Sequence, residues 1–307
     1  MTKSTTDRPS DWVLSKQRVR AAFNRAAANY DRAAAVQREI GKRLLERLSL
    51  TRLNPKWILD IGAGTGTIGY ALSRQYRQAR IIDLDIAKSM LDEARRATPY
   101  LARWFGKRAF ICGEAEQLPL GTARFDLVLS NLTLQWCAEP DRVFAECRRV
   151  LRPGGLLMFS TLGPDTLKEL RASWSGIDGY THVHGFIDMH DLGDALVRAG
   201  FSDTVMERED LTVTYRQVAD LMRDLKTIGA HNSAAARPPG LTGKHRLATV
   251  TANYEKFRRD GLLPATHEVI YGHCWAPAAP RSVQRRTPEG AIAVPIESLR
   301  KQNNRNT

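Results

Sequence analysis

The feature that most constrains this fold is an apolar run followed directly by a glycine-rich turn. Residues 57–61 (Trp-Ile-Leu-Asp-Ile) are typical of a buried strand, and Gly62, Gly64 and Gly66 follow it. Glycine has no Cβ, so it permits positive φ and lets a ligand approach the backbone. Residues 68–72 can then begin a helix whose N-terminal amides face that ligand. Strand, turn and helix together indicate a nucleotide site at the carboxyl end of a parallel sheet.

Two features favour S-adenosylmethionine (SAM) over a dinucleotide as the ligand of this turn. Residues 64–69 also fit the dinucleotide pattern G-x-G-x-x-G, and Asp85 follows at about the required 20 residues. Asp60, however, precedes Gly62 by two residues, where a carboxylate could meet the ammonium of a methionine but would repel a pyrophosphate. The later segments also follow in order, because five stretches resemble the successive motifs of class I SAM-dependent methyltransferases: 60–66, 83–85, 113–115, 125–131 and 151–155.

That resemblance implies an α/β, Rossmann-like fold: a seven-stranded, mostly parallel sheet with helices on both faces and a helical cap. Apolar periodicity and turn residues predict strands over 57–61, 80–84, 109–112, 124–130, 156–160, 205–215 and 267–275. Four parts are expected in chain order: a disordered N-terminus (1–11), lid helices (12–50), a methyltransferase domain (51–275) and a basic disordered tail (276–307). We expect cap insertions at about 162–187 and 216–262.

The remaining cofactor contacts follow from the position of each residue in these motifs. Asp85 ends the second expected strand, where its carboxylate can accept hydrogen bonds from both ribose hydroxyls. Met90 is placed against the adenine face, with ordinary core packing as the alternative. Glu114, or the neighbouring amide of Ala115, would contact the adenine edge. Asn131 follows the fourth expected strand, near the place where the transferred methyl group should lie.

The composition of the chain indicates which classes of partner it can bind. It holds 46 Lys and Arg against 33 Asp and Glu, and the net charge of +13 indicates an anionic partner: nucleic acid, a membrane surface or an acidic protein. No run approaches the roughly 18 apolar residues of a membrane span, and the N-terminus lacks a signal-peptide core. Four cysteines without a C-x-x-C pair fit reduced thiols in a cytoplasmic protein, and Cys112 is expected in the core.

Segments outside the nucleotide motifs carry a narrower resemblance. Residues 23–37, 131–136, 160–170 and 221–230 together resemble the malonyl-acyl-carrier-protein O-methyltransferases of biotin synthesis. The resemblance implies SAM-dependent methylation of the free carboxylate of a malonyl thioester on an acidic carrier protein, giving the methyl ester that primes synthesis of the pimeloyl precursor of biotin. No Asn/Asp-Pro-Pro-aromatic motif follows the fourth expected strand, which argues against a nucleic-acid substrate.

The implied reaction needs orientation rather than a general base. A malonyl carboxylate is already ionised at neutral pH, so the protein must hold one oxygen in line with the methyl group and exclude water. Arg171 and Arg223 are the candidates for orienting it, with Lys226 behind them; the alternative for each is a solvated helix face. Arg25 and Tyr30 would form a lid over the methyl group, with a buried alanine-rich helix as the alternative.

A second family shares part of this pattern. Residues 163–171, 191–201 and 264–267 also resemble the methyltransferase-like assembly factor of respiratory complex I, which is linked to protein arginine hydroxylation. We favour the carboxyl methyltransferase because residues 23–37 follow its N-terminal lid pattern more closely. A SAM-fold protein that only binds partners is disfavoured, because every expected cofactor position is filled.

Three histidines raise the question of a metal site. His182, His184 and His190 stand close together in the sequence, but no carboxylate–histidine motif lies on a regular element. We therefore expect no metal. A loop histidine that meets the carboxylate or the thioester of the substrate is the preferred alternative.

Overall fold

The computed structural model of this chain describes residues 15–100, 107–230, 243–278, 285–286 and 292–293. The expected disordered N-terminus lies outside the described residues, and so does most of the expected basic tail. From that tail, β8 (Arg285–Arg286) and β9 (Ile292–Ala293) pair as a short antiparallel ladder.

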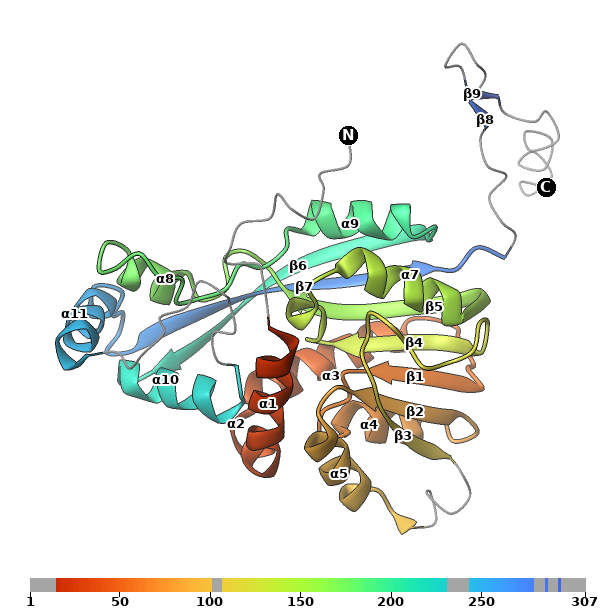
Figure 1. The fold of residues 1–307 in the computed structure, drawn as a ribbon, viewed down its shortest axis with the longest axis horizontal. Helices are drawn as coiled ribbons and strands as arrows, with labels where there is room; N and C mark the ends of the chain where they lie inside the picture. Colours follow the sequence, from red (N-terminus) through yellow and green to blue (C-terminus); the bar gives the residue numbers. More distant parts are fainter. Residues whose placement is uncertain (1–14, 101–106, 231–242, 279–284, 287–291, 294–307) are drawn as a thin grey trace.

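A seven-stranded sheet forms the centre of the molecule (Figure 1), in the spatial order β3-β2-β1-β4-β5-β7-β6. Strands β1 to β5 pair in parallel, whereas β7 is antiparallel to both of its neighbours, so the expected mostly parallel sheet is confirmed. The strands are β1 (Trp57–Ile61), β2 (Arg80–Asp85), β3 (Arg108–Cys112), β4 (Phe125–Asn131), β5 (Leu151–Leu162), β6 (Ser202–Tyr215) and β7 (Leu263–Trp275). The strand order reverses between β1 and β4, which is where open α/β sheets bind ligands.

Helices cover both faces of the sheet. One face packs against α3 and α4 through Ile40, Leu44 and Leu72, and the other packs against α7 and α9. The helices are α1 (Lys16–Ala26), η3 (Ala27–Asn29), α2 (Tyr30–Ala33), α3 (Ala35–Ser49), α4 (Thr67–Gln75), α5 (Lys88–Ala97), η4 (Leu134–Trp136), α7 (Pro140–Val150), α8 (Lys168–Trp174), α9 (Met189–Arg198), α10 (Val218–Thr227) and α11 (Lys244–Glu255). None of these helices is long and apolar enough to cross a membrane, in the part of the chain that the structure describes.

Strands β6 and β7 extend past the main sheet and carry a second small core. Helices α8, α10 and α11, which we call the cap, gather at this end of the molecule (Figure 1). Trp174, Leu221 and Tyr254 from these three helices pack on Leu263 and Ala265 of β7. Because β6 and β7 pair from Ser202–Trp275 through to Tyr215–Leu263, they form one continuous support that joins the cap to the sheet.

Several sequence expectations differ from the structure; among the strands, β6 begins at Ser202 rather than at residue 205, and β7 begins at Leu263 rather than at residue 267. Cys112 is exposed rather than buried, because it ends β3, the edge strand of the sheet. The fifth strand begins at Leu151 rather than at residue 156, since the Pro-Gly-Gly segment that was expected to separate helix from strand continues β5 with a register shift against β4. A β-bulge accommodates such an extra residue without ending the strand.

Candidate active site

The three glycines of the turn after β1 have different roles, although all have positive φ (72°, 54° and 81° for Gly62, Gly64 and Gly66). A Cβ on Gly62 would lie 1.9 Å from Thr133 Oγ1, and one on Gly66 would lie 2.7 Å from Ala94 Cβ. A Cβ on Gly64 would meet no atom within 4 Å. Gly66 therefore permits close packing of α5, whereas Gly64 leaves room for a ligand against the backbone.

Asp85, at the end of β2, is fixed by the same turn. Its Oδ2 accepts a hydrogen bond from the Gly64 N–H (2.9 Å), and its Oδ1 accepts one from the Ala87 N–H (2.7 Å). Burial raises the pKa of this carboxyl, and the backbone N–H groups act in the opposite direction. The side chain lines a cavity, and each carboxylate oxygen has two lone pairs, so it retains the capacity to accept the ribose hydroxyls expected there.

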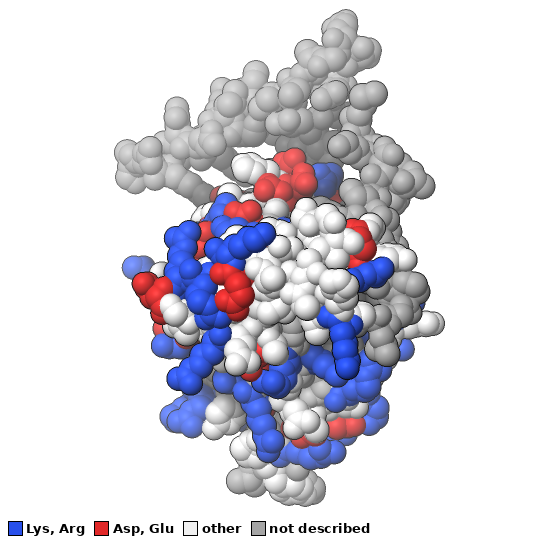
Figure 2. Space-filling model, turned by 90° about the vertical axis from the view of Figure 1, so that its left-hand side faces the viewer, with Lys and Arg blue, Asp and Glu red and all other residues white. Residues whose placement is uncertain are grey.

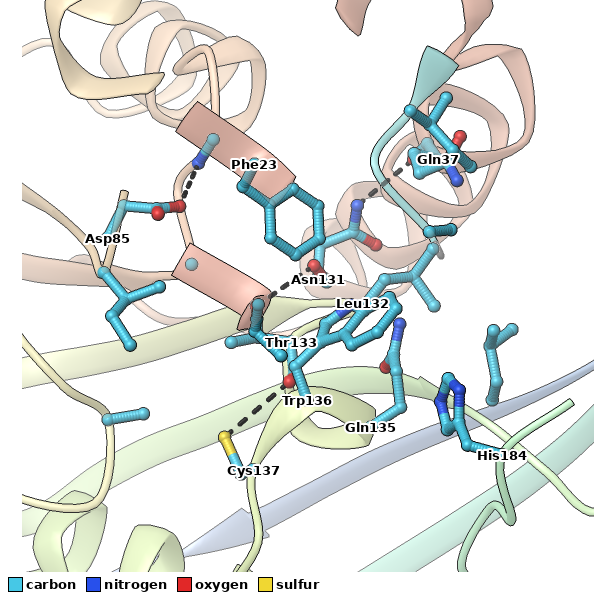
Figure 3. A pocket seen from close by; sticks show the side chains of 18 of the residues that line it. Phe23, Gln37, Asp85, Asn131, Leu132, Thr133, Gln135, Trp136, Cys137 and His184 are labelled. Carbon is cyan, nitrogen blue, oxygen red and sulfur yellow. Dashed lines mark hydrogen bonds between the residues drawn. The ribbon is translucent and has the colours of Figure 1, made fainter. Parts of the chain in front are cut away.

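That cavity runs from the carboxyl ends of β1, β2 and β4 towards the cap. Figure 3 shows Asp85 at one side of it and His184 at the other. The structure brings eight of the predicted site residues to its wall: Tyr30, Gly62, Gly64, Asp85, Met90, Glu114, Ala115 and Asn131. The glycine turn and the ends of the second and fourth strands thus meet at one place, as the strand order requires.

Four predicted site residues lie elsewhere. Gly66 packs against α5, and Asp60 is buried away from the cavity wall. Arg223 is 68% exposed and pairs with Asp220 on its own helix, so its placement matches the solvated-face alternative. Arg171 is also exposed, and its guanidinium donates to the carbonyl of Pro164 (2.8 Å). The structure therefore does not bring either arginine into the cavity.

Asp60 belongs to a buried charge network. It stands beside Asp83 in the register of β1 and β2, and Arg108 of β3 donates to Asp83 Oδ2 (2.9 Å) and to the Gly66 carbonyl (3.2 Å). Arg108 pairs directly with Asp83 and acts on Asp60 only through its charge. Burial and the charge of Asp83 raise the pKa of Asp60 well above its usual range, and burial raises that of Asp83 to about 6. The network supports the turn from behind and offers no carboxylate to the ligand.

Helices α1 and α2 close over the cofactor end of the cavity. Asn24 accepts a hydrogen bond from the Ser89 N–H of α5 (2.9 Å), and Asp31 accepts one from the hydroxyl of Thr65 in the turn (2.6 Å). Phe23 and Tyr30 line the cavity, which fits the lid prediction for Tyr30. Arg25 is exposed and does not line it.

A pair of acidic residues after β3 fastens the start of α1. Lys16 forms ion pairs with Glu114 (2.8 Å) and with the buried Glu116, and Arg20 also reaches Glu114 (3.3 Å). These cations lower the pKa of Glu114, most strongly through the hydrogen bond from Lys16. Glu114 was expected to contact adenine. In the structure its carboxylate is paired with Lys16 and Arg20 of α1. The backbone amide of the neighbouring Ala115 is therefore better placed to contact the adenine.

The cap side of the cavity is lined by aromatic and neutral polar side chains. Trp136 meets the edge of Phe23 (ring centroids 5.3 Å apart) and lies 5.0 Å from the ring of His184. Asn131 donates to the carbonyl of Gln37 (3.1 Å) and accepts from Ser160 Oγ (2.7 Å), so its amide is held in one orientation. Neutral donors and acceptors of this kind can orient an anionic substrate without a formal charge on the wall.

The three histidines of the loop and α9 are not brought together. His182 Nε2 bonds Asp178 (2.9 Å) with its ring stacked on Trp174, whereas His190 is 88% exposed beside Asp188. His184 is 6% exposed, and burial, followed by the charge of Arg171, lowers its pKa to about 4. In the described part of the chain, no group of three or more His, Cys, Asp or Glu is placed to hold a metal ion.

Several cavity residues were not singled out by sequence reasoning. The lid cation Lys16, and the apolar cap residues Leu225 and Ile228, come from helices distant in the chain. Gln37, on α3, reaches the cavity beside Asn131, which is 94 residues away. No spacing in the sequence could indicate these contacts, because each depends on how the lid and the cap fold over the sheet.

The chain resembles known proteins over both its core and its cap. Residues 59–159 match a family model described as "Methyltransferase domain". The malonyl-[acyl-carrier protein] O-methyltransferase of Methylovorus sp. (strain MP688) is 54% identical over 270 residues, covering 87% of this chain and 91% of that protein. That of Nitrosospira multiformis is 47% identical over 299 residues, covering 94% and 97%. The YcgJ protein of Bacillus subtilis superposes with a TM-score of 0.54 at 14% identity (77% of this chain, 98% of that chain), which shows the fold alone.

Proposed function

Because this chain belongs to the malonyl-[acyl-carrier protein] O-methyltransferase family, we propose that it methylates the free carboxylate of a malonyl thioester carried by acyl-carrier protein. It is a SAM-dependent methyltransferase with the class I fold, as the glycine turn predicted. The proposal rests on the 54% identity, which spans 87% of the chain and therefore includes the cap as well as the common core. The product would be the malonyl methyl ester that primes synthesis of the biotin precursor. We do not retain the assembly-factor alternative.

The cofactor end of the cavity has the chemistry that SAM requires. The open face of Gly64 and the carboxylate of Asp85 would hold the methionine and ribose parts, and Met90 would cover the base. Phe23 and Tyr30 close that end from the lid. When bound, SAM supplies a methyl group made electrophilic by its sulfonium.

The reaction that we propose needs no proton transfer. A carboxylate oxygen forms a bond to the methyl carbon as the methyl–sulfur bond breaks, and the electron pair stays on sulfur. Three residues on the cavity wall suit this role, because they hold their protons or remain neutral: Tyr30, Cys137 and His184. Burial raises the pKa of Tyr30 and raises that of Cys137 to about 12, while His184 is neutral at physiological pH. None of these groups needs to act as a general base.

Exclusion of water is the second requirement of this reaction. Trp136, Phe186 and Leu170 give the cap side of the cavity an apolar wall, and the lid helices cover the other side. A carboxylate that leaves water for such a wall becomes more reactive towards the methyl group, provided that the protein holds it in line. Positioning, rather than acid–base chemistry, is therefore the contribution that we assign to this chain.

The outer surface of the cap would bind the carrier protein. Figure 2 looks onto this end of the molecule, where Lys and Arg side chains gather. Carrier proteins are typically acidic, so such a face would steer one by charge. The exposed cations on or beside the cap helices include Lys168, Arg171, Arg216, Arg223, Lys226, Lys244, Arg246, Lys256 and Arg259. Helices α8 and α10 also supply Leu170 and Leu225 to the cavity, so a docked carrier would stand close to the acceptor site.

Intact-mass spectrometry of the carrier tests the proposal directly. The protein is incubated with SAM and malonyl-loaded carrier protein, and the mass of the carrier is followed. We expect the malonyl-loaded carrier to gain the mass of one methyl group and to lose it again on ester hydrolysis. An acetyl-loaded carrier should show no gain. A protein that binds SAM but leaves the malonyl carrier unmethylated would refute the proposed function. The same substrate on coenzyme A shows whether the carrier itself is required.

The chemistry of the partner and the thiols supports a cytoplasmic location. All four cysteines are free thiols in the structure, including the buried Cys147 and Cys274. Disulfides are rare where the thiol pool is kept reduced, so free cysteines fit that compartment. We propose the cytoplasm on this basis, together with the carrier-bound substrate, and we propose no nucleic-acid partner.

A further inference from the structure

The acceptor carboxylate must be held by some group on the cap side of the cavity, and the structure leaves few candidates. The two predicted arginines do not line the cavity. Lys16, a cation that does line it, is engaged by Glu114 and Glu116 at the lid. An anion placed in this part of the cavity must therefore be bound by neutral hydrogen-bond donors.

His184 offers such a donor. Apart from Glu116 Oε2, which pairs with Lys16, two cavity residues have a buried side-chain atom without a hydrogen-bond partner among the described residues: Gln37 Oε1 and His184 Nε2. Gln37 Oε1 is an oxygen, which would repel a carboxylate. His184 Nε2 is a nitrogen, which can donate a hydrogen bond to one. A buried polar atom without a partner costs free energy, so its retention in an apolar wall indicates a ligand.

The surroundings of His184 hold its ring in place. Trp136 lies on one side (ring centroids 5.0 Å apart) and Phe186 contacts it at 4.6 Å. Figure 3 shows the ring next to Gln135 and Trp136, across the cavity from Asp85. The other two histidines on the cavity wall already have ring-nitrogen partners, since His182 bonds Asp178 and His267 bonds the carbonyl of Ala265.

We propose that the Nε2–H of His184 donates a hydrogen bond to one oxygen of the acceptor carboxylate and leaves the other oxygen free to attack the methyl group. This inference rests on the proposed function and deepens it. A neutral donor orients the anion and lowers its nucleophilicity less than a bidentate arginine would, because a guanidinium pairs both oxygens at once. His184 thereby also selects malonyl over acyl groups that end in a methyl.

Arg171 has a supporting part in this arrangement. Its charge is felt at the ring of His184, although its guanidinium is anchored on Pro164 and does not line the cavity. A nearby cation that does not line the cavity still attracts the carboxylate, and it disfavours a charged imidazole. The anion is therefore drawn in by charge and positioned by a neutral hydrogen bond.

Two substitutions separate the hydrogen bond from the packing of the ring. His184→Phe keeps a ring between Trp136 and Phe186 but has no donor, whereas His184→Gln keeps an N–H at a similar reach. We expect His184→Phe to lower kcat/KM for malonyl-loaded carrier by about 10- to 100-fold, the effect of losing a hydrogen bond to a charged group. His184→Gln should stay within about fivefold of the wild type, because hydrogen bonding rather than ring shape decides the effect. His190→Phe, at a histidine 88% exposed on α9, is the matched control and should leave kcat/KM unchanged.

Binding measurements distinguish a hydrogen bond to the substrate from a purely structural role of His184, because a structural role would not change the preference between two carriers. The wild type should bind malonyl-loaded carrier more tightly than acetyl-loaded carrier, and His184→Phe should lose this preference while its SAM affinity stays within about twofold. His184→Leu repeats the test with a different shape if the phenylalanine variant does not fold. Wild-type activity in a folded variant that lacks the donor would overturn this inference and leave the proposed function standing. A wild type that binds SAM but forms no ester would instead overturn the proposed function.

Discussion

Two glycines inside helices should respond in opposite directions to the same substitution. Gly69 lies in α4 and Gly193 in α9, and neither has a positive φ. A Cβ on Gly69 would lie 2.1 Å from Asp83 Oδ1 and 2.6 Å from Arg108 Nη2. A Cβ on Gly193 would meet no atom within 4 Å. Alanine is therefore accommodated at Gly193, whereas at Gly69 it enters the buried pair of Asp83 and Arg108.

The magnitude follows from two opposing effects. Alanine in a helix interior is favoured over glycine by up to about 1 kcal/mol, and this gain applies at both positions. Disrupting a buried ion pair costs about 3–5 kcal/mol, because a charge is left without its partner. The side chains of Arg108 and Asp83 are 2% and 0% exposed, so water cannot replace the lost contact. Gly69→Ala should lose about 2–4 kcal/mol net, and Gly193→Ala should gain about 0.5–1 kcal/mol.

Thermal and urea unfolding of the two variants measure the contrast. For a domain of this size each kcal/mol moves Tm by about 2–4 °C, so Gly69→Ala should unfold about 4–16 °C below the wild type and Gly193→Ala slightly above it. SAM affinity should also fall in Gly69→Ala, since Arg108 bonds the Gly66 carbonyl of the turn. If Gly69→Ala proved as stable as the wild type, the buried charge network would not have the rigidity that we assign to it.

Three further substitutions test the site and its surroundings. Asp60→Asn should change the SAM dissociation constant by less than about threefold, because the side chain does not line the cavity; a large loss would restore the predicted ammonium contact. Burial raises the pKa of Asp83 to about 6, so between about pH 4 and that value the folded state holds a proton that the unfolded state has released, and stability should fall as pH rises. Urea unfolding of Asp60→Asn should show a shallower fall, because burial and then the charge of Asp83 raise the pKa of Asp60, and this titration is absent from the variant. In the native protein one thiol should react rapidly with a disulfide reagent, and Cys112→Ser should abolish that phase, because Cys112 is exposed and burial raises the pKa of Cys147. Arg223→Glu should raise KM for the carrier about 3- to 10-fold at low salt without changing SAM affinity, because it reverses one charge of the docking face; equal KM values at low and high salt would contradict the proposed face.

The sequence by itself determined the cofactor half of the protein. The glycine turn needs residues 62, 64 and 66 within a few positions of one strand, and their positive φ values carry a signal that is local in the chain. Asp85 and Asn131 could be placed because each ends a parallel strand, and the ends of such strands meet at one edge of the sheet. The local glycine pattern, and the rule that parallel strands end at one edge of the sheet, were sufficient to place these cofactor-site residues.

Only the tertiary structure decided which polar groups face the acceptor. Asp60 was assigned to the ligand from its spacing, but the pairing of β1 with β2 places it beside Asp83 and away from the cavity. The charge of Arg171 and Arg223 suggested a carboxylate site, yet neither side chain lines the cavity. Arg171 bonds the carbonyl of Pro164, and Arg223 is exposed beside Asp220. His184 reaches the cavity because the loop after α8 folds back against Trp136. Such contacts join segments far apart in the chain, so no periodicity records them, and they exist only once the lid and cap pack over the sheet.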